Sequence, residues 1–405
     1  MSRNGAVGTP ALAATWARSP WPLADIIAAK QGRTVSVVLP ALDEEDTVAD
    51  VIASIVPYLG TLVDELVVLD SGSTDRTASR ARAAGATVVP REQVLPGTPV
   101  VHGKGEVLWR GVAATSGEIV VFVDSDLLEP GAHFVPSLVG PLLMVENLEL
   151  VKGFYRRPLR IGDTTDQDGG GRVTQLTVRP LLTALRPELA GVFQPLGGEY
   201  AATRQLLESL PFAPGYGVEI GLLLDTYHRL GAGPIGQVGL GTRRHRNRPT
   251  SELAVMSRQI IATMLPRLGL RDSGAGFTTF AAAEGQLSMS VAPVSTLDRP
   301  PLITLDDYVR GHRRPSMSAP PLTAMPPPPW SSMEGAVLPE LLVCCLGCAQ
   351  ILAQNLARCR LRHDVDELDA AYLLVRRHTL GDEGDDGLLV DGGTLLADDE
   401  CLGDF

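Results

Sequence analysis

Cysteine is missing from the first 343 residues of this 405-residue chain, since all five cysteines follow Val343. The first 343 residues can form neither disulfides nor thiolate metal sites, which favours a reducing compartment. Further along, three cysteines and a histidine are spaced like zinc ligands: Cys345, Cys348, Cys359 and His363. The apolar run around them lacks the turn residues of a zinc knuckle, so we expect incidental cysteines.

Long apolar runs are missing too. The best candidate for a membrane span, 341–349, has nine residues, whereas a spanning helix needs about twenty. The N-terminal segment also lacks the continuous apolar core of a secretory signal. We therefore expect a cytoplasmic protein without membrane insertion.

Positive charge is in the minority, with 35 lysines and arginines against 47 acidic residues and a net charge of -12. This balance disfavours nonspecific binding to nucleic acid or to an anionic membrane. An anionic ligand therefore needs a local basic pocket. Two stretches, 152–186 and 243–248, concentrate arginine, whose guanidinium group matches phosphate and carboxylate oxygens. We expect roughly half of these charges to be solvated or paired with acids.

Strand and helix patterns alternate regularly between residues 34 and 150. Short runs rich in valine, isoleucine and leucine, at 34–42, 64–70, 86–90 and 119–123, are separated by helical segments. This order predicts βαβ units and a mainly parallel α/β sheet flanked by helices. Residues 151–290 are less regular and form a smaller second part. We expect 1–33 to be a flexible lead-in and 291–405 a proline-rich linker with an acidic tail of low order.

Polar side chains follow three of the predicted strands. The first ends in Pro40 to Glu44, the second in Asp70 and Ser71, and the fourth in Asp124 to Asp126. None of these junctions has the glycine pattern of a dinucleotide site or a P-loop. The carboxyl ends of parallel strands meet at one edge of a sheet, where ligands bind.

Asp124 and Asp126 share one face if the backbone stays extended. Carboxylate oxygens held in this way suit Mg²⁺ or Mn²⁺ together with a substrate diphosphate. Lys104, between two glycines at a helix start, adds a positive group. The alternative interpretation is a solvated turn whose aspartates cap a helix.

Three of these segments look like the nucleotide-binding half of the GT-A (Rossmann-like) glycosyltransferases: VSVVLPALDEEDTV, VLDSGSTDRT and VVFVDSDL. A fuller set adds HGKGE, GGGRVT, QPLGGEYA, GYGVEIGLLLD and RRHRN. With these, the chain resembles the retaining glucosyl-3-phosphoglycerate synthases of actinobacteria, glycosyltransferase family 81, over residues 20–290. The resemblance implies a GT-A subdomain for the sugar nucleotide at 34–150 and an acceptor-binding subdomain at 151–290.

The resemblance also implies roles for individual residues. The donor UDP-glucose is expected to contact Pro40, Leu42, Glu44, Ser71, Lys104, Asp124, Ser125, Tyr216 and Glu219. The acceptor 3-phosphoglycerate is expected to contact Gly171, Arg172, Thr174 and Asn247. Asp126 and His245 would bind Mg²⁺ or Mn²⁺, and Glu219, Asp126 and Lys104 are the expected catalytic residues. Many relatives have asparagine at the position of Asp43, which is left out of the predicted site.

The resemblance implies glucose transfer to the acceptor 2-hydroxyl with retention, and a homodimer. Retention requires either a covalent sugar intermediate or attack on the sugar carbon from the same face from which the leaving group departs. No carboxylate is convincingly placed as a nucleophile, so we expect same-face attack. Two alternatives remain: a mannosyl-3-phosphoglycerate synthase that uses GDP-mannose, and a noncatalytic sugar-nucleotide sensor.

Overall fold

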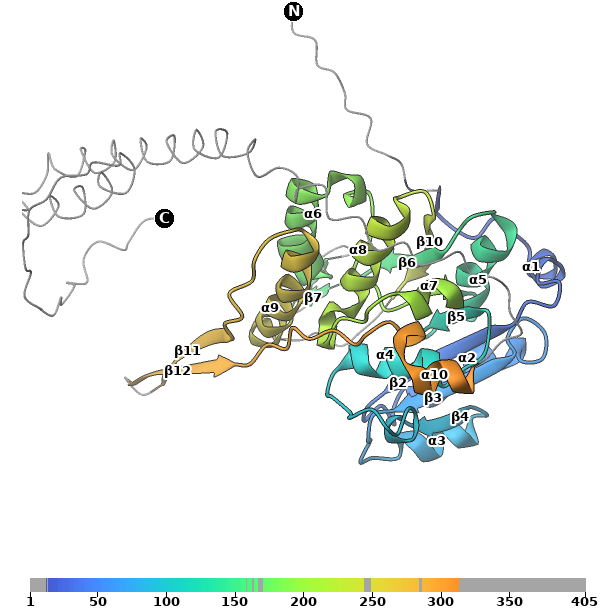
Figure 1. The fold of residues 1–405 in the computed structure, drawn as a ribbon, viewed down its shortest axis with the longest axis horizontal. Helices are drawn as coiled ribbons and strands as arrows, with labels where there is room; N and C mark the ends of the chain where they lie inside the picture. Colours follow the sequence, from blue (N-terminus) through green and yellow to red (C-terminus); the bar gives the residue numbers. More distant parts are fainter. Residues whose placement is uncertain are drawn as a thin grey trace, which may run out of the picture. The chain divides into compact units, whose positions relative to one another are not determined.

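The computed structural model describes residue 12 and residues 14–157, 159–161, 164–166, 170–243, 249–283 and 286–312. Its main element is an eight-stranded sheet in the order β1-β10-β6-β9-β5-β2-β3-β4 (Figure 1). The strands are β1 (Ala14–Trp16), β2 (Val35–Ala41), β3 (Glu65–Asp70), β4 (Thr87–Pro90), β5 (Ile119–Phe122), β6 (Leu150–Arg156), β9 (Tyr200–Thr203) and β10 (Ile235–Thr242). Two hairpins lie outside this sheet: β7 (Leu159–Ile161) with β8 (Thr164–Asp166), and β11 (Phe277–Ala283) with β12 (Gln286–Ala292).

The sheet is parallel except at β9, which runs antiparallel to both of its neighbours, β5 and β6. All four residues of β5 are buried, as expected for a central strand covered on both faces. The predicted mainly parallel sheet is confirmed. Because β9 is reversed, its first residue, Tyr200, pairs with Phe122 at the carboxyl end of β5.

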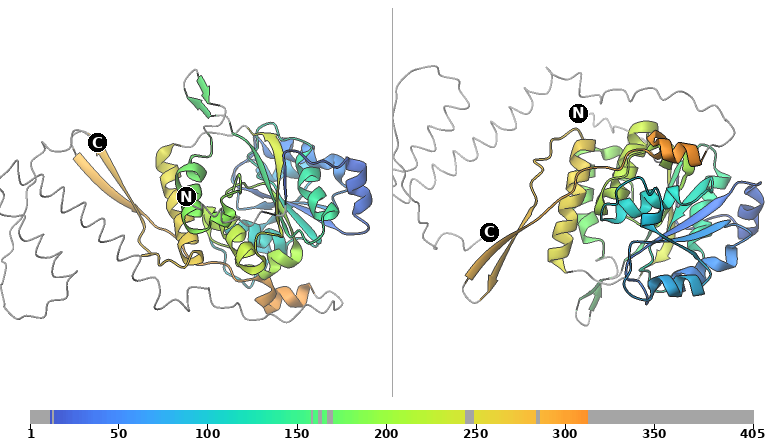
Figure 2. Two further views of the ribbon diagram at one scale, coloured as in Figure 1. Left: turned by 90° about the horizontal axis from the view of Figure 1, so that it is seen from above. Right: turned by 60° about the horizontal axis from the view of Figure 1, so that its bottom comes forward.

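Helices cover both faces of the sheet (Figure 2). They are α1 (Leu23–Ala29), α2 (Val48–Ile55), α3 (Thr77–Ala83), α4 (Lys104–Ala113), α5 (Phe134–Met144), α6 (Arg179–Leu185), α7 (Arg204–Ser209), α8 (Val218–Leu230), α9 (Thr250–Arg267) and α10 (Asp306–Gly311). One apolar cluster packs α1, α2, α3 and α5 against the sheet, and the other packs α4 and α6 to α9. Among the described residues, none forms a helix long and apolar enough to cross a bilayer.

The N-terminal segment is more ordered than its composition predicts. Residues of β1 pair with β10 and form one edge of the main sheet. Helix α1 follows β1, its Ile26 is buried, and the helix packs against α5. The flexible lead-in is therefore wrong for residues 14–29, because three backbone pairs and one apolar side chain tie them to the fold.

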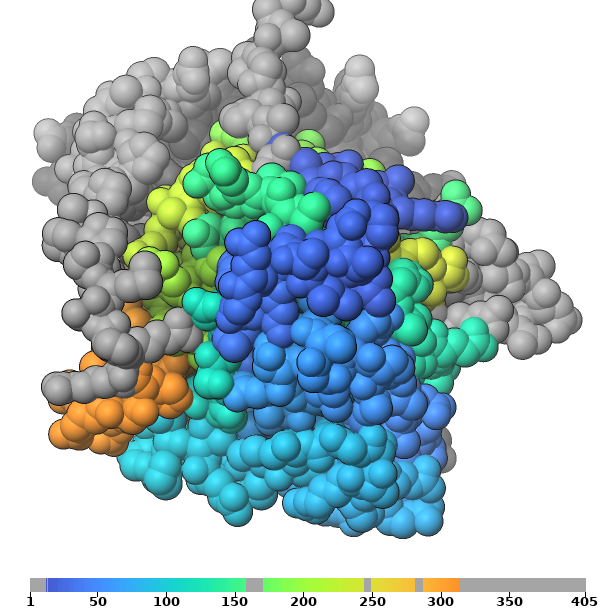
Figure 3. Space-filling model, turned by 90° about the vertical axis from the view of Figure 1, so that its right-hand side faces the viewer, coloured from blue at the N-terminus to red at the C-terminus, as the bar shows by residue number. Residues whose placement is uncertain are grey.

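Residues 298–312 also differ from the expected tail of low order. They include a 3₁₀ turn, η6 (Leu302–Thr304), and α10, with Leu302 and Tyr308 buried. The Trp109 indole donates to the carbonyl of Pro300 at 2.9 Å, and Arg299 pairs with Glu106. In Figure 3 this segment, in orange, lies beside the cyan part of the chain that includes α4. The group with zinc-like spacing lies outside the described residues.

Candidate active site

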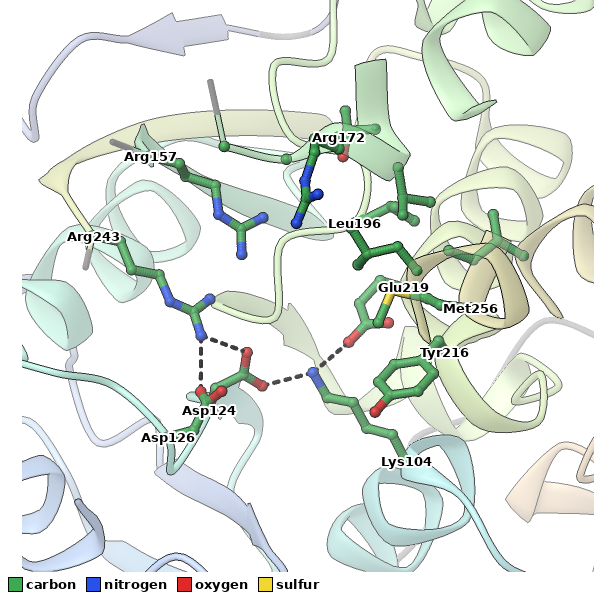
Figure 4. Close-up of a pocket in the computed structure, with 16 residues that line it drawn as sticks. Lys104, Asp124, Asp126, Arg157, Arg172, Leu196, Tyr216, Glu219, Arg243 and Met256 are labelled. Carbon is green, nitrogen blue, oxygen red and sulfur yellow. Dashed lines mark hydrogen bonds and ion pairs between the residues drawn. The ribbon is translucent and has the colours of Figure 1, made fainter. Parts of the chain in front are cut away.

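A pocket opens beside the carboxyl end of β5 and carries charges of both signs (Figure 4). Its walls come from the turn after β5, the starts of α4 and α8, and the stretch 170–174. The charged side chains in its lining are Lys104, Arg157, Arg172, Arg243, Asp124, Asp126 and Glu219. The pocket therefore brings together Asp124 and Asp126, which form a D-x-D motif, with the predicted Lys104. Part of the predicted acceptor set lies in the same lining.

Lys104 is the first residue of α4 and points across the pocket toward two carboxylates (Figure 4). Its Nζ lies 2.6 Å from Asp124 Oδ1 and 2.7 Å from Glu219 Oε1. Burial alone lowers the pKa of Lys104, but Asp124 and Glu219 raise it well above its usual value. The lysine is therefore charged at any physiological pH and bridges the sheet edge to α8.

Arg243 follows β10 and bridges Asp124 and Asp126, an arrangement that sequence reasoning missed. Its Nη2 lies 3.2 Å from Asp124 Oδ2 and 2.9 Å from Asp126 Oδ1. Burial raises the pKa of Asp124, but Lys104 and then Arg243 outweigh it, so that this pKa falls below its usual value. Asp124 is therefore an anion held between two cations.

Behind Arg243 lies a fully buried carboxylate, Glu199, which sequence reasoning also missed. Arg243 Nη1 lies 3.1 Å from Glu199 Oε1, and the Tyr155 hydroxyl donates to Glu199 Oε2 at 2.7 Å. Burial, the largest effect, raises the pKa of Glu199, and Arg243 opposes the rise. These contacts fix the orientation of the Arg243 guanidinium toward the D-x-D turn.

Close packing above Asp124 depends on a glycine. Gly198, just before Glu199, packs so closely on the Asp124 carboxylate that a Cβ atom there would overlap it. The motif QPLGGEYA thus has a steric reason for glycine at this position.

The predicted donor residues lie along the same sheet edge but in two groups. Lys104, Asp124, Tyr216 and Glu219 line the pocket. Pro40 lies near the end of β2, and Leu42, Glu44, Ser71 and Ser125 follow β2, β3 and β5; these five residues are outside the pocket lining. The Ser125 hydroxyl donates to the Pro40 carbonyl at 2.6 Å, and the Ser71 N–H donates to the Ala41 carbonyl at 2.9 Å. These bonds hold the ends of the three strands together.

Three of the four predicted acceptor residues, Gly171, Arg172 and Thr174, line the pocket. Gly171 has a φ of +76°, a conformation that favours glycine, and Thr174 is buried at the start of the turn before α6. The fourth, Asn247, and the predicted metal ligand His245 lie outside the described residues.

Asp126 is suited to a divalent cation. Its side chain is 45% exposed and lines the pocket, so its carboxylate is open to a ligand. Oxygen donors of this kind suit Mg²⁺ and Mn²⁺, which commonly take only one or two carboxylates and complete their coordination with water and substrate oxygens. Within the described ranges, no group of three or more potential ligands surrounds this position.

Lys152 on β6 is a buried cation below the pocket. Its Nζ donates to the Gly197 carbonyl at 2.6 Å and lies 4.5 Å from the centre of the Tyr200 ring. Burial lowers its pKa from 10.5 to about 8. The folded chain therefore loses this proton at a lower pH than the unfolded chain does.

We expect Lys152→Met to reveal this difference. Between about pH 8 and 10 the unfolded chain binds more protons at Lys152, so the free energy of unfolding of the unmodified chain rises with pH. The gap between the unmodified chain and the variant should shift in favour of the unmodified chain by about 1 kcal/mol or more over this window. Urea unfolding of both chains at several pH values measures this difference in free energy of unfolding. A difference that stays constant with pH would contradict the lowered pKa of Lys152.

Comparison with known proteins agrees with this geometry. The family model described as glycosyl transferase family 2 matches residues 36–143. A glucosyl-3-phosphoglycerate synthase of Mycolicibacterium smegmatis is 63% identical over 291 residues, which cover 72% of this chain and 96% of that protein. This chain belongs to the glucosyl-3-phosphoglycerate synthase family. A synthase of Petrotoga mobilis, at 39% identity over 69% of this chain and 89% of that protein, is a more distant member.

Solved structures of the Mycobacterium tuberculosis glucosyl-3-phosphoglycerate synthase share the fold. One, at 59% identity, is a complex with Mn²⁺, UDP-glucose and phosphoglyceric acid; the match has a TM-score of 0.67 and covers 72% of this chain and 98% of that one. Another, at 60% identity and with a TM-score of 0.67, holds Mg²⁺ and UDP. The predicted family and GT-A fold are therefore confirmed.

Proposed function

We propose that this chain transfers glucose from UDP-glucose to the 2-hydroxyl of 3-phosphoglycerate, with retention at the sugar carbon. The observation that carries the proposal is the single pocket in which Asp124, Asp126, Lys104 and Glu219 meet Arg172 and Thr174. Relatives of this chain include glucosyl-3-phosphoglycerate synthases, and one solved structure of such an enzyme is a complex with Mn²⁺, UDP-glucose and phosphoglyceric acid. The chain is a glycosyltransferase, and its cofactor is Mg²⁺ or Mn²⁺, the ions bound in solved structures of its family.

Asp126, together with His245, would hold the divalent cation. When bound, the cation supplies positive charge to the diphosphate that leaves. Lys104 and Arg243 give the protein's own positive charge to the same part of the pocket, where they stay protonated. The sugar would lie beside Tyr216 and Glu219, which line the pocket at the start of α8.

The two carboxylates nearest to Lys104 are poor candidates for a nucleophile. Both Asp124 and Glu219 are within 2.7 Å of the lysine ammonium, which stabilises their charge and lowers their nucleophilicity. We therefore assign attack to the acceptor hydroxyl from the face that UDP leaves, with its proton passing to the leaving phosphate. The protein's part is to orient both substrates and to exclude water.

Incubation with UDP-glucose, 3-phosphoglycerate and Mg²⁺ tests the proposal. UDP release is expected only when the metal and the acceptor are both present, and Asp126→Ala should abolish it. GDP-mannose in place of UDP-glucose tests the mannosyl alternative, which predicts the faster reaction with GDP-mannose. UDP-glucose that binds without UDP release under all these conditions would mean a sensor and would overturn the proposal.

Glu219→Gln should lower kcat by about 100-fold, because a neutral amide no longer balances Lys104 beside the sugar. No covalent glycosyl-enzyme should accumulate in the variant, since same-face attack has no such intermediate. Intact-protein mass spectrometry of the variant with UDP-glucose measures the adduct. A mass increase of one hexose on the protein would contradict same-face attack.

We also propose a homodimer, supported by the β11–β12 ribbon that extends from α9 (Figure 1). Phe280 pairs with Met289 in this ribbon, and the alternation of side chains puts Leu287 and Val291 on their face. All four are exposed, Phe280 by 78%. An isolated two-stranded ribbon is marginally stable in water. A second copy of the chain would cover this apolar face.

Sedimentation tests the dimer. Met289→Ser should convert dimers to monomers, whereas Thr279→Ser, on the opposite face of the ribbon, should leave them intact. A monomeric unmodified chain would rule the dimer out.

We further propose a cytoplasmic location, because nucleotide sugars and phosphorylated acids carry several negative charges and do not cross a bilayer unaided.

A further inference from the structure

Two of the four basic side chains in the pocket are already committed to the protein's own acids. Lys104 contacts Asp124 and Glu219, and Arg243 contacts Asp124, Asp126 and Glu199. Their charges are therefore largely balanced before a substrate enters. A trianionic acceptor needs positive charge from elsewhere in the pocket.

Arg157 is differently placed. Among the described residues, no carboxylate forms an ion pair with its guanidinium, and its Nε is buried without a hydrogen-bond partner. Its Cζ lies 5.5 Å from the centre of the Tyr155 ring, a cation–π contact that orients the side chain. Figure 4 shows the Arg157 and Arg172 guanidinium groups pointing toward the same space. Arg157 is thus a fixed cation that faces the pocket.

The backbone of Arg157 is tied to the predicted acceptor loop. Its carbonyl accepts the N–H of Gly170 at 2.9 Å, and a Cβ on Gly170 would lie only 2.5 Å from the same carbonyl oxygen. The glycines before Arg172 therefore let the loop close directly on Arg157. Arg157 and Arg172 are 15 residues apart in sequence, and both line the pocket.

The acceptor has two anionic groups, a carboxylate and a phosphate, which together carry about three negative charges. One guanidinium fork binds one such group well. Arg172 supplies one guanidinium fork. Gly171 and Thr174 lie beside it in the same loop and can add backbone amides. We propose that Arg157 is a further acceptor-binding residue, which holds the anionic group of 3-phosphoglycerate that Arg172 does not hold. This inference rests on the proposed function.

Arg157→Gln in the full chain tests it, with Arg157→Lys as the conservative variant and Arg156→Gln, an exposed neighbour, as the control. The KM for 3-phosphoglycerate should rise about 10- to 100-fold in Arg157→Gln, the range for a lost charged hydrogen bond. The KM for UDP-glucose should change less than about 3-fold. Arg157→Lys keeps the charge without the fork and should be intermediate, and Arg156→Gln should match the unmodified chain.

Two one-anion ligands identify the group that Arg157 holds. Glycerol 3-phosphate lacks the carboxylate and glycerate lacks the phosphate, and calorimetry with UDP and Mn²⁺ present measures the binding of each. Arg157→Gln should weaken one of them about 10-fold or more and leave the other within about 3-fold.

Three results would overturn the role of Arg157: an unchanged KM for 3-phosphoglycerate, equal weakening of both one-anion ligands, or a loss confined to UDP-glucose. Thermal unfolding of each variant checks that it is folded. An unmodified chain without transferase activity would instead overturn the proposed function, so the two failures are distinguishable.

Discussion

Lys104→Met is expected to lower kcat/KM by about 100- to 1,000-fold. The change leaves Asp124 and Glu219 facing each other without the cation that lies within 2.7 Å of both. An unpaired buried charge costs about 3–5 kcal/mol, and the same cation is lost from the leaving diphosphate. Steady-state kinetics with UDP-glucose and 3-phosphoglycerate measure the effect.

The variant should also respond to pH in a defined direction. Lys104 is the largest of the effects that lower the pKa of Asp124, so without it this carboxylate in the folded variant takes up its proton at a higher pH than in the folded unmodified chain. Its deficit in free energy of unfolding should therefore shrink as pH falls. Lys30→Met, which breaks a partly exposed pair with Asp64, is the matched control and should cost less than about 1 kcal/mol at unchanged kcat. A variant with normal kinetics would contradict the assigned role of Lys104.

Leu302→Ala is expected to destabilise the chain by about 2–5 kcal/mol, because Leu302 is fully buried and its truncation leaves a cavity. Leu297→Ala, just before residues 298–312 and 83% exposed, should change the free energy of unfolding by less than about 0.5 kcal/mol. Urea unfolding of both variants measures the contrast. Equal effects would mean that residues 298–312 do not pack on the fold in solution.

Truncations extend the same test. A chain that ends after residue 312 should keep its activity, whereas one that ends at residue 296 should lose stability and activity together. The shorter chain lacks Arg299, the partner of the fully buried Glu106, and the Pro300 carbonyl that accepts from Trp109. Both contacts are made to α4, the helix that starts with Lys104. Full activity of the shorter chain would contradict this coupling.

Local patterns were sufficient for the parallel strands β2 to β5 and for half of the pocket. Runs such as Ile119–Val123 are apolar on both faces and therefore mark central strands, and the residues that follow them reach the carboxyl edge by geometry alone. Asp124 and Asp126 are found in this way. Lys104 stands out by its place between two glycines at a helix start. The family motifs then added roles for Glu219 and Arg172, for which charge alone gave weak signals.

Glu199 and Arg243 escaped prediction for a physical reason. Glu199 precedes β9, and β9 is antiparallel, so the start of this strand lies where the parallel strands end. A search for polar residues after strands does not include it. Arg243 stood out only as one of several arginines, and its partners are 44 to 119 residues away in sequence. The same non-local packing explains why composition misjudged residues 14–29 and 298–312.

The contacts of Arg299 and Pro300 with α4 have a consequence for synthesis on the ribosome. Glu106 and Trp109 are translated about 190 residues before their partners. A nascent chain can therefore form the strands and helices of the nucleotide half early, yet the helix that carries the lysine is fully anchored only when translation is well past residue 302. We expect activity to appear late in synthesis, and in one step.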